Sequence, residues 1–141
     1  MKKLITVSLL LVFVVSFFSA NSFAADKKTK TAVTKAAKIE VFYFHYTRRC
    51  VTCNAVETVT KEAIAEMYPA QLKKGQITFK SVNLDEKEND PIAKQCKAEG
   101  QQLLFLSKGK RVDLTDKGFM YAKNSPEKLK AEVKKVIDGL L

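Results

Sequence analysis

The chain has 141 residues, 46% of them hydrophobic, and carries a formal net charge of +10 with three cysteines and one histidine. This length has room for one ordinary domain and little else. The lysines are spread along the chain without the clustering of arginine and aromatic residues that a nucleic-acid groove would show, so a solvated cationic surface is favoured and no nucleic-acid partner is expected. Such a surface can still attract acidic partners weakly.

The first 24 residues have the pattern of a secretory signal. Lys2 and Lys3 form a charged start, residues 4–20 are mostly apolar, and Ser22-Phe23-Ala24 fits the small-x-small cleavage rule. We therefore expect a signal peptide over 1–24 and export to the periplasm or the extracellular space. Because the apolar run is only slightly short of a membrane span, retention by an N-terminal membrane anchor is the alternative.

The next segment, 25–36, is rich in Lys, Thr and Ala with only Val33 to bury, which predicts a flexible lead-in before a domain over 37–141. Loss of Lys2 and Lys3 with the leader would leave 23 basic side chains against 15 acidic ones, a net charge of about +8. The mature protein is therefore expected to stay strongly basic.

A cysteine pair stands where a strand turns into a helix. Residues 38–44 are β-branched and aromatic on both faces apart from Glu40, which is typical of a central strand. Apolar side chains three or four residues apart then predict one helix face, formed by Val56, Val59, Ala63, Ile64 and Met67. The sequence C-V-T-C lies between them, with Cys50 at or just before the first helical turn.

This position favours a thiolate at Cys50. Unpaired backbone N–H groups, the positive end of the helix dipole and the guanidinium charges of Arg48 and Arg49 all stabilise a negative sulfur. Dithiol–disulfide exchange needs that state in its attacking or leaving sulfur. A disulfide between Cys50 and Cys53 would close almost no loop and so stabilise the fold little, which favours a chemical role for the pair.

The middle of the chain predicts a second strand and a short helix. Residues 76–84 alternate with a period of two, and the long crossover from the first strand implies parallel pairing. Asn89 or Asp90 can then cap a helix that has Pro91 at its first position and stops at Gly100.

The last third predicts a hairpin and a terminal helix. Residues 103–106 and 111–114 form two strands around the Lys108-Gly109 turn, and residues 116–118 predict a further turn. The run Ser125-Pro126-Glu127 has a hydroxyl cap, a proline at the first helical position and an acid in the first turn, which together begin the last helix.

From about residue 36 onward, this order of elements around C-V-T-C resembles the thioredoxin-like family of thiol–disulfide oxidoreductases. The resemblance implies an α/β fold with a four-stranded mixed sheet and flanking helices, in the order β-α-β-α-β-β-α. It also implies a redox-active cysteine pair that needs no cofactor and works on protein thiols or disulfides with a redox partner that the chain does not identify. With its freer access and larger dipole effect, Cys50 is expected to attack, and Cys53 to resolve the mixed disulfide.

The chain departs from this family in four places. The cis-proline that usually faces the cysteine pair is replaced at Gln101 or Gln102, which are candidates for lining a substrate groove. No tryptophan precedes the first cysteine, Val51-Thr52 separates the pair, and the first strand lacks the buried acid found beneath the second cysteine. His45 or Tyr43 is a candidate for the missing proton acceptor.

Each candidate residue also has a plainer interpretation. The cysteine pair could be two buried structural thiols, and Arg48 and Arg49 could merely solubilise a loop. His45 could tune the pKa of Cys50 or simply pack at the end of a strand. Cys96 is expected to be a small buried apolar residue and not a third redox thiol, and the two glutamines could be ordinary loop residues.

Two other functions compete with disulfide exchange. A redox-inactive thioredoxin-like binding module would explain the missing cis-proline. A soft-metal protein would bind copper or zinc through Cys50 and Cys53 with His45 or Cys96, although no second C-x-x-C or H-x3-H completes a zinc site. The expected site therefore has no metal.

Overall fold

The computed structural model describes residues 39–141. The predicted signal peptide, the alternative membrane anchor and the lead-in all lie outside these residues. Among the residues described, no helix combines the length and the apolar character that a bilayer span requires.

A four-stranded mixed sheet in the order β2-β1-β3-β4 forms the centre of the domain. The central strand β1 (Ile39–His45) pairs parallel with β2 (Ile77–Asn83) and antiparallel with β3 (Gln102–Ser107). The edge strand β4 (Lys110–Asp113) pairs antiparallel with β3. The predicted strands are thus confirmed, with each boundary shifted by one residue.

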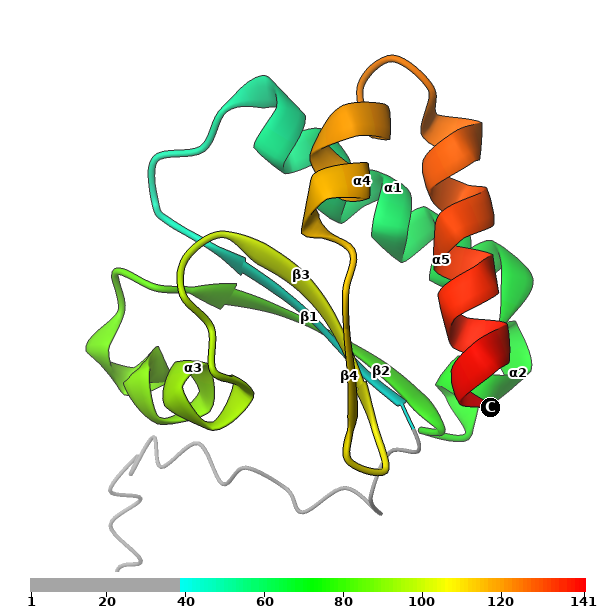
Figure 1. The fold of residues 1–141 in the computed structure, drawn as a ribbon, viewed down its shortest axis with the longest axis horizontal. Coiled ribbons are helices and arrows are strands. Elements are labelled where there is room, and N and C mark those ends of the chain that lie inside the picture. The colour runs from blue at the N-terminus through cyan, green and yellow to red at the C-terminus, as the bar shows by residue number, and fades with distance from the viewer. Residues whose placement is uncertain (1–38) are drawn as a thin grey trace, which may run out of the picture. The chain divides into compact units, whose positions relative to one another are not determined.

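Helices cover both faces of this sheet (Figure 1). One face packs against α1 (Val51–Met67), α4 (Thr115–Tyr121) and α5 (Pro126–Leu140), with the short α2 (Pro69–Lys73) after α1. A 3-10 turn over Lys87–Asn89 leads into α3 (Asp90–Cys96) on the other face.

Alternate residues of β1 supply the two halves of the core. Val41 and Tyr43 belong to the cluster shared with α1 and α5, whereas Phe42 and Phe44 belong to the cluster shared with α3, and all four are buried. This is the pattern expected of a central strand, because neighbouring side chains on a strand point to opposite faces.

The expected turn at 116–118 is wrong, because these residues lie inside α4. The side chain of Asp113 accepts a hydrogen bond from the backbone N–H of Thr115 at 2.9 Å, which satisfies a donor at the start of that helix. Gly118 is buried where α4 meets α1, and a Cβ there would lie 3.2 Å from Cγ1 of Val56. A glycine that looks like a turn residue in sequence is thus a site of close helix contact.

Two helix ends also differ from expectation. The helix at 90–96 ends when Lys97 adopts a left-handed conformation (φ 52°, ψ 47°), three residues before Gly100. At the start of α5, Ser125 takes the N-cap position but its hydroxyl makes no capping hydrogen bond. The predicted last helix is confirmed as α5, on which Leu129, Val133 and Ile137 are fully buried.

Candidate active site

Cys50 occupies the N-cap of α1, and its sulfur caps the helix. The backbone N–H of Cys53 donates to Sγ of Cys50 at 3.0 Å, and the two cysteines form a disulfide with a Cα–Cα distance of 5.0 Å. Cys50 is exposed, whereas Cys53 is only 3% exposed. One cysteine of the pair is therefore exposed and the other is shielded.

The loop between β1 and α1 is held by the loop that follows β2. The backbone N–H of Thr47 donates to Oδ2 of Asp85 at 2.8 Å, and the hydroxyl of Thr47 accepts from the amide of Asn83 at 3.0 Å. The Thr47 N–H holds the pKa of Asp85 below its usual value. Because β1 and β2 are parallel, these two loops leave the same edge of the sheet and can brace one another.

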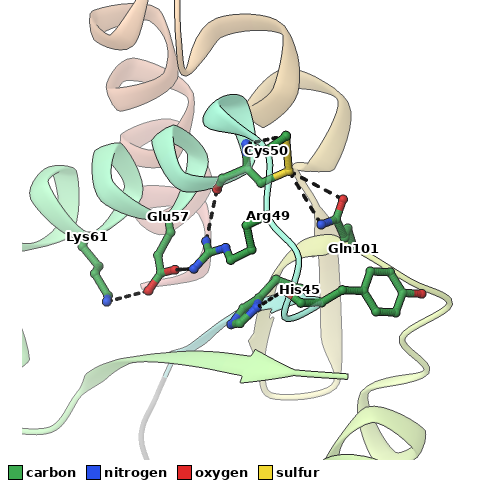
Figure 2. A network of polar contacts seen from close by, with 8 residues as sticks. His45, Arg49, Cys50, Glu57, Lys61 and Gln101 are labelled. Carbon is green, nitrogen blue, oxygen red and sulfur yellow. Dashed lines mark hydrogen bonds and ion pairs between the residues drawn. A yellow bond between two sulfur atoms is a disulfide. The ribbon is translucent and has the colours of Figure 1, made fainter. Parts of the chain in front are cut away.

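Arg49 extends into a polar network beside the first turns of α1 (Figure 2), and its side chain is 20% exposed. Its Nη1 lies 2.6 Å from Oε2 of Glu57, and its Nη2 donates to the backbone carbonyl of Cys53 at 3.2 Å. The guanidinium also lies 5.4 Å from the centroid of the Tyr43 ring. Arg49 thus braces the cysteine turn, while its charge is shared with a carboxylate.

Arg48 differs from its neighbour, since it is exposed and makes no ion pair within residues 39–141. Of the two arginines predicted to act on the thiol, only Arg48 has a charge that no carboxylate compensates. Exposure to water screens that charge, which makes its electrostatic field sensitive to ionic strength.

Glu57 also belongs to this network, although it was not among the site residues predicted from sequence. Its side chain is 12% exposed and also pairs with Lys61 at 2.6 Å. Burial raises the pKa of Glu57, but hydrogen bonds from Lys61, Arg49 and Ser81 outweigh that effect, so the pKa is lowered overall. Glu57 could have been found from sequence by its spacing, because it lies four residues after Cys53 and four before Lys61 on the same helix.

Neither candidate for the missing proton acceptor is well placed for that role. Tyr43 is fully buried, and burial raises the pKa of its phenol despite the nearby charge of Arg49, so it stays protonated at neutral pH. Nδ1 of His45 contacts the carbonyl of Tyr46 at 3.0 Å, and the imidazole points away from the cysteine sulfurs in Figure 2. His45 instead stacks on Tyr43, with ring centroids 5.9 Å apart.

Of the two glutamines, the structure brings Gln101 alone to the cysteine pair. Its Nε2 donates to Sγ of Cys53 at 3.7 Å (Figure 2). The side chain of Gln102 turns elsewhere, donating to Asp113 at 3.1 Å and accepting from the backbone N–H of Glu99 at 3.0 Å. No cis peptide bond occurs in residues 39–141, and from this segment it is the side chain of Gln101 that contacts the pair.

A cavity of about 540 Å³ opens beside this glutamine. Gln101 forms part of its wall, and three carboxylates also line it, from Glu99, Asp113 and Asp116. Tyr46 and Val51 are close to Cys50 in sequence, and they are 42% and 71% exposed. The surroundings of the pair therefore combine exposed apolar side chains with an acidic hollow.

Cys96 lies away from the pair, on the α3 face of the sheet, and is 3% exposed. Burial is the main cause that raises the pKa of its thiol. It therefore matches the expected small buried residue. Within residues 39–141, no group of three or more His, Cys, Asp or Glu side chains gathers as a metal site would, so Cys96 does not complete a ligand set with Cys50 and Cys53.

The sheet order, the helices on both faces and a cysteine pair at the start of α1 together match the architecture that the resemblance implied. The fold is thioredoxin-like. No model of a known protein family matches the chain, and no curated protein matches it.

Among solved structures, this thioredoxin-like domain is similar to the thioredoxin of Malassezia sympodialis (Mala s 13), described as a member of a pan-allergen family. The two chains are 20% identical with a TM-score of 0.45, and the match covers 73% of this chain and 80% of that one. So distant a likeness adds nothing about activity. A cysteine pair in a thioredoxin-like fold is in itself consistent with redox function.

Proposed function

We propose that this protein is an exported thiol–disulfide oxidoreductase that exchanges disulfides with protein substrates through Cys50 and Cys53. The observation that carries the proposal is the asymmetry of the pair: Cys50 is exposed at the N-cap of α1, and Cys53 is buried one turn further along. Attack on a bulky substrate needs an accessible sulfur, whereas resolution needs a second sulfur that is protected from competing disulfides.

The reaction follows from this geometry. In the reduced protein, the Cys50 thiolate attacks one sulfur of a substrate disulfide, and the other substrate sulfur leaves as a thiolate. Cys53, once deprotonated, then attacks Sγ of Cys50, which releases the second substrate sulfur and forms the Cys50–Cys53 disulfide. Two electrons pass from the protein to the substrate, and the reverse sequence oxidises a substrate dithiol.

Backbone donors favour the thiolate that this sequence requires. The N–H of Cys53 already points at Sγ of Cys50 at 3.0 Å, and a negative sulfur would accept that bond more strongly than a disulfide sulfur does. A stabilised thiolate stabilises the reduced protein and makes its disulfide a better oxidant. The net direction in the cell also depends on the redox partner.

Export belongs to the proposal because of the pattern over residues 1–24. Periplasmic or extracellular substrates would meet the pair in an oxidising compartment, where disulfides persist. A fractionation experiment tests this: the full-length chain, expressed with a C-terminal tag, should be recovered in the exported fraction with the leader removed. Recovery in the membrane fraction with the leader intact would support the anchor instead.

The activity itself is tested by equilibration with glutathione, followed by trapping. The wild-type pair should reach a defined dithiol–disulfide equilibrium, and Cys53→Ser should accumulate mixed disulfides through Cys50 in an extract. Cys96→Ser is the matched control, since it removes a buried cysteine away from the pair. A wild-type protein that exchanges with neither glutathione nor dithiothreitol would rule out the enzyme.

One observation favours a second function, a redox-inactive binding module. The backbone before β3 has no cis peptide bond, so the family's usual substrate clamp is absent from the described residues. A binding module would retain its protein partners after Cys50→Ser and Cys53→Ser are combined. An oxidoreductase that holds substrates covalently would lose them.

A further inference from the structure

A second cavity, of about 380 Å³, lies on the α3 face at the end of the sheet away from the cysteine pair. It is lined by the beginning of β1, the end of α3 and the hairpin between β3 and β4. Four basic residues line it, namely Lys97, Lys108, Lys110 and Arg111, against the single carboxylate of Glu40. The cavity is therefore strongly cationic.

Most of this positive charge is uncompensated. Glu40 already pairs with Lys80 at 3.2 Å, and Arg111 approaches Asp113 only at 3.8 Å. Within residues 39–141, Lys97, Lys108 and Lys110 make no ion pair. Bringing several like charges together around one hollow is unfavourable unless an anion compensates them.

Two of these lysines also have unfavourable backbone conformations. Lys97 (φ 52°) and Lys108 (φ 45°) are the only residues other than glycine with positive φ in residues 39–141, and both line this cavity. The left-handed conformation disfavours a side chain with a Cβ, and glycine or asparagine is preferred there. Each lysine therefore replaces a residue that would fit the backbone better.

Both positions are ones where the preferred residue is well defined. Lys97 ends α3 in the left-handed conformation, where glycine is usual. Lys108 and Gly109 form the two-residue loop between the paired residues Ser107 and Lys110, and both have positive φ, as in a type I′ turn. Such turns strongly prefer asparagine followed by glycine. Strained residues that converge on one cavity point to a functional constraint.

We propose that this cavity binds a small anion that carries a phosphate or diphosphate group. Ammonium groups act as mobile point charges and bind phosphate oxygens without a fixed geometry, which suits the three free lysines. Leu106 and Cys96 add apolar surface to the lining, so the ligand carries an organic portion beside its anionic group. The site is separate from the cysteine pair, so the proposal does not depend on catalysis by that pair.

The test measures binding of sodium diphosphate to the full-length protein by calorimetry at constant ionic strength. The decisive variant combines Lys97→Asn with Lys108→Asn, which removes two charges and gives both backbones a residue they favour. We expect its Kd for diphosphate to rise about fivefold or more, since two charge-assisted contacts are lost. Its Tm without anion should rise by about 2–6 °C, because asparagine tolerates positive φ.

A matched control combines Lys74→Asn with Lys123→Asn. These lysines are also exposed and outside regular helices, but neither has positive φ and neither lines the cavity. This control should change the Kd by less than about twofold, as expected for screened distant charges, and should not raise the Tm. A Kd that rises equally in both double variants would show general charge attraction and overturn the site.

Two further outcomes decide the proposal. If the wild-type protein binds vesicles containing phosphatidylglycerol but not free diphosphate, and only Lys97→Asn with Lys108→Asn weakens that binding, the phosphate belongs to a lipid headgroup. If neither probe binds, the proposal is wrong. It is also wrong if the Tm of that variant does not rise, because the backbone would then not disfavour lysine at positions 97 and 108.

Discussion

Arg49 forms an ion pair with Glu57 at 2.6 Å while its other terminal nitrogen donates to the carbonyl of Cys53. The charge nearest to Cys50 in sequence is thus tied to a carboxylate on the same helix as the cysteines. Glu57 therefore limits how strongly Arg49 can stabilise a thiolate at Cys50, because an ion pair has a much weaker field than an isolated cation.

We predict that Glu57→Gln makes the cysteine pair more oxidising. The uncompensated Arg49 should lower the pKa of the Cys50 thiol and raise the reduction potential by about 10–30 mV. Alkylation rates against pH and equilibration with glutathione measure the two quantities. Glu66→Gln is the control, since Glu66 is on the same helix but pairs with Lys130. If the effect of Glu57→Gln persists when Arg49 is also replaced by Gln, Glu57 does not act through Arg49.

The same carboxylate predicts a pH dependence of stability. The pKa of Glu57 in the folded protein lies below its ordinary value of 4.5. The contribution of the ionised carboxylate to the free energy of unfolding is therefore fully present above about pH 4.5 and is lost as the pH falls through the lower folded value. At pH 7, the free energy of unfolding of the wild-type protein should exceed that of Glu57→Gln by about 1–2 kcal/mol. Urea unfolding at several pH values should show this difference shrinking below pH 4.5; a constant difference would contradict it.

Gln101 is predicted to tune the buried sulfur. Because its amide donates to Sγ of Cys53, Gln101→Glu should replace a donor with a negative charge and disfavour the Cys53 thiolate. Resolution of mixed disulfides should slow about tenfold, the effect of about 1.4 kcal/mol on a barrier. Stopped-flow measurement of product release would detect this. Gln76→Glu, at an exposed position, provides the charge-matched control and should leave the rate unchanged.

Two glycines give opposite predictions for the same substitution. Gly118→Ala should destabilise the domain by about 1–2 kcal/mol, since its Cβ would press on Val56 at 3.2 Å. Gly139→Ala should stabilise it by up to about 0.5–1 kcal/mol, because that position is helical and has nothing within 4 Å. Denaturant unfolding of both variants tests the assignment of residues 116–118 to a helix. A stabilising Gly118→Ala would contradict the close contact of α4 with α1.

Local sequence predicted the individual strands and the longest helices, whereas the four-stranded mixed sheet was implied by the resemblance to the thioredoxin-like family. These predictions rest on local properties of the chain: the branched and aromatic residues of β1, the period of two in β2, the Ser125-Pro126-Glu127 start of α5 and the strand-to-helix position of Cys50. Because the local pattern placed Cys50 at the start of a helix, it also predicted unpaired backbone N–H groups beside the Cys50 sulfur.

Tertiary structure decided which charges and polar groups meet. Residues 116–118 have the composition of a turn, but burial of Gly118 against Val56 places them in α4. The contact of Gln101 with Cys53 spans 48 residues and depends on the antiparallel pairing of β1 with β3. Sequence shows that an arginine precedes Cys50, but the energy of a charge depends on distance and burial, and only folding brought Glu57 to Arg49.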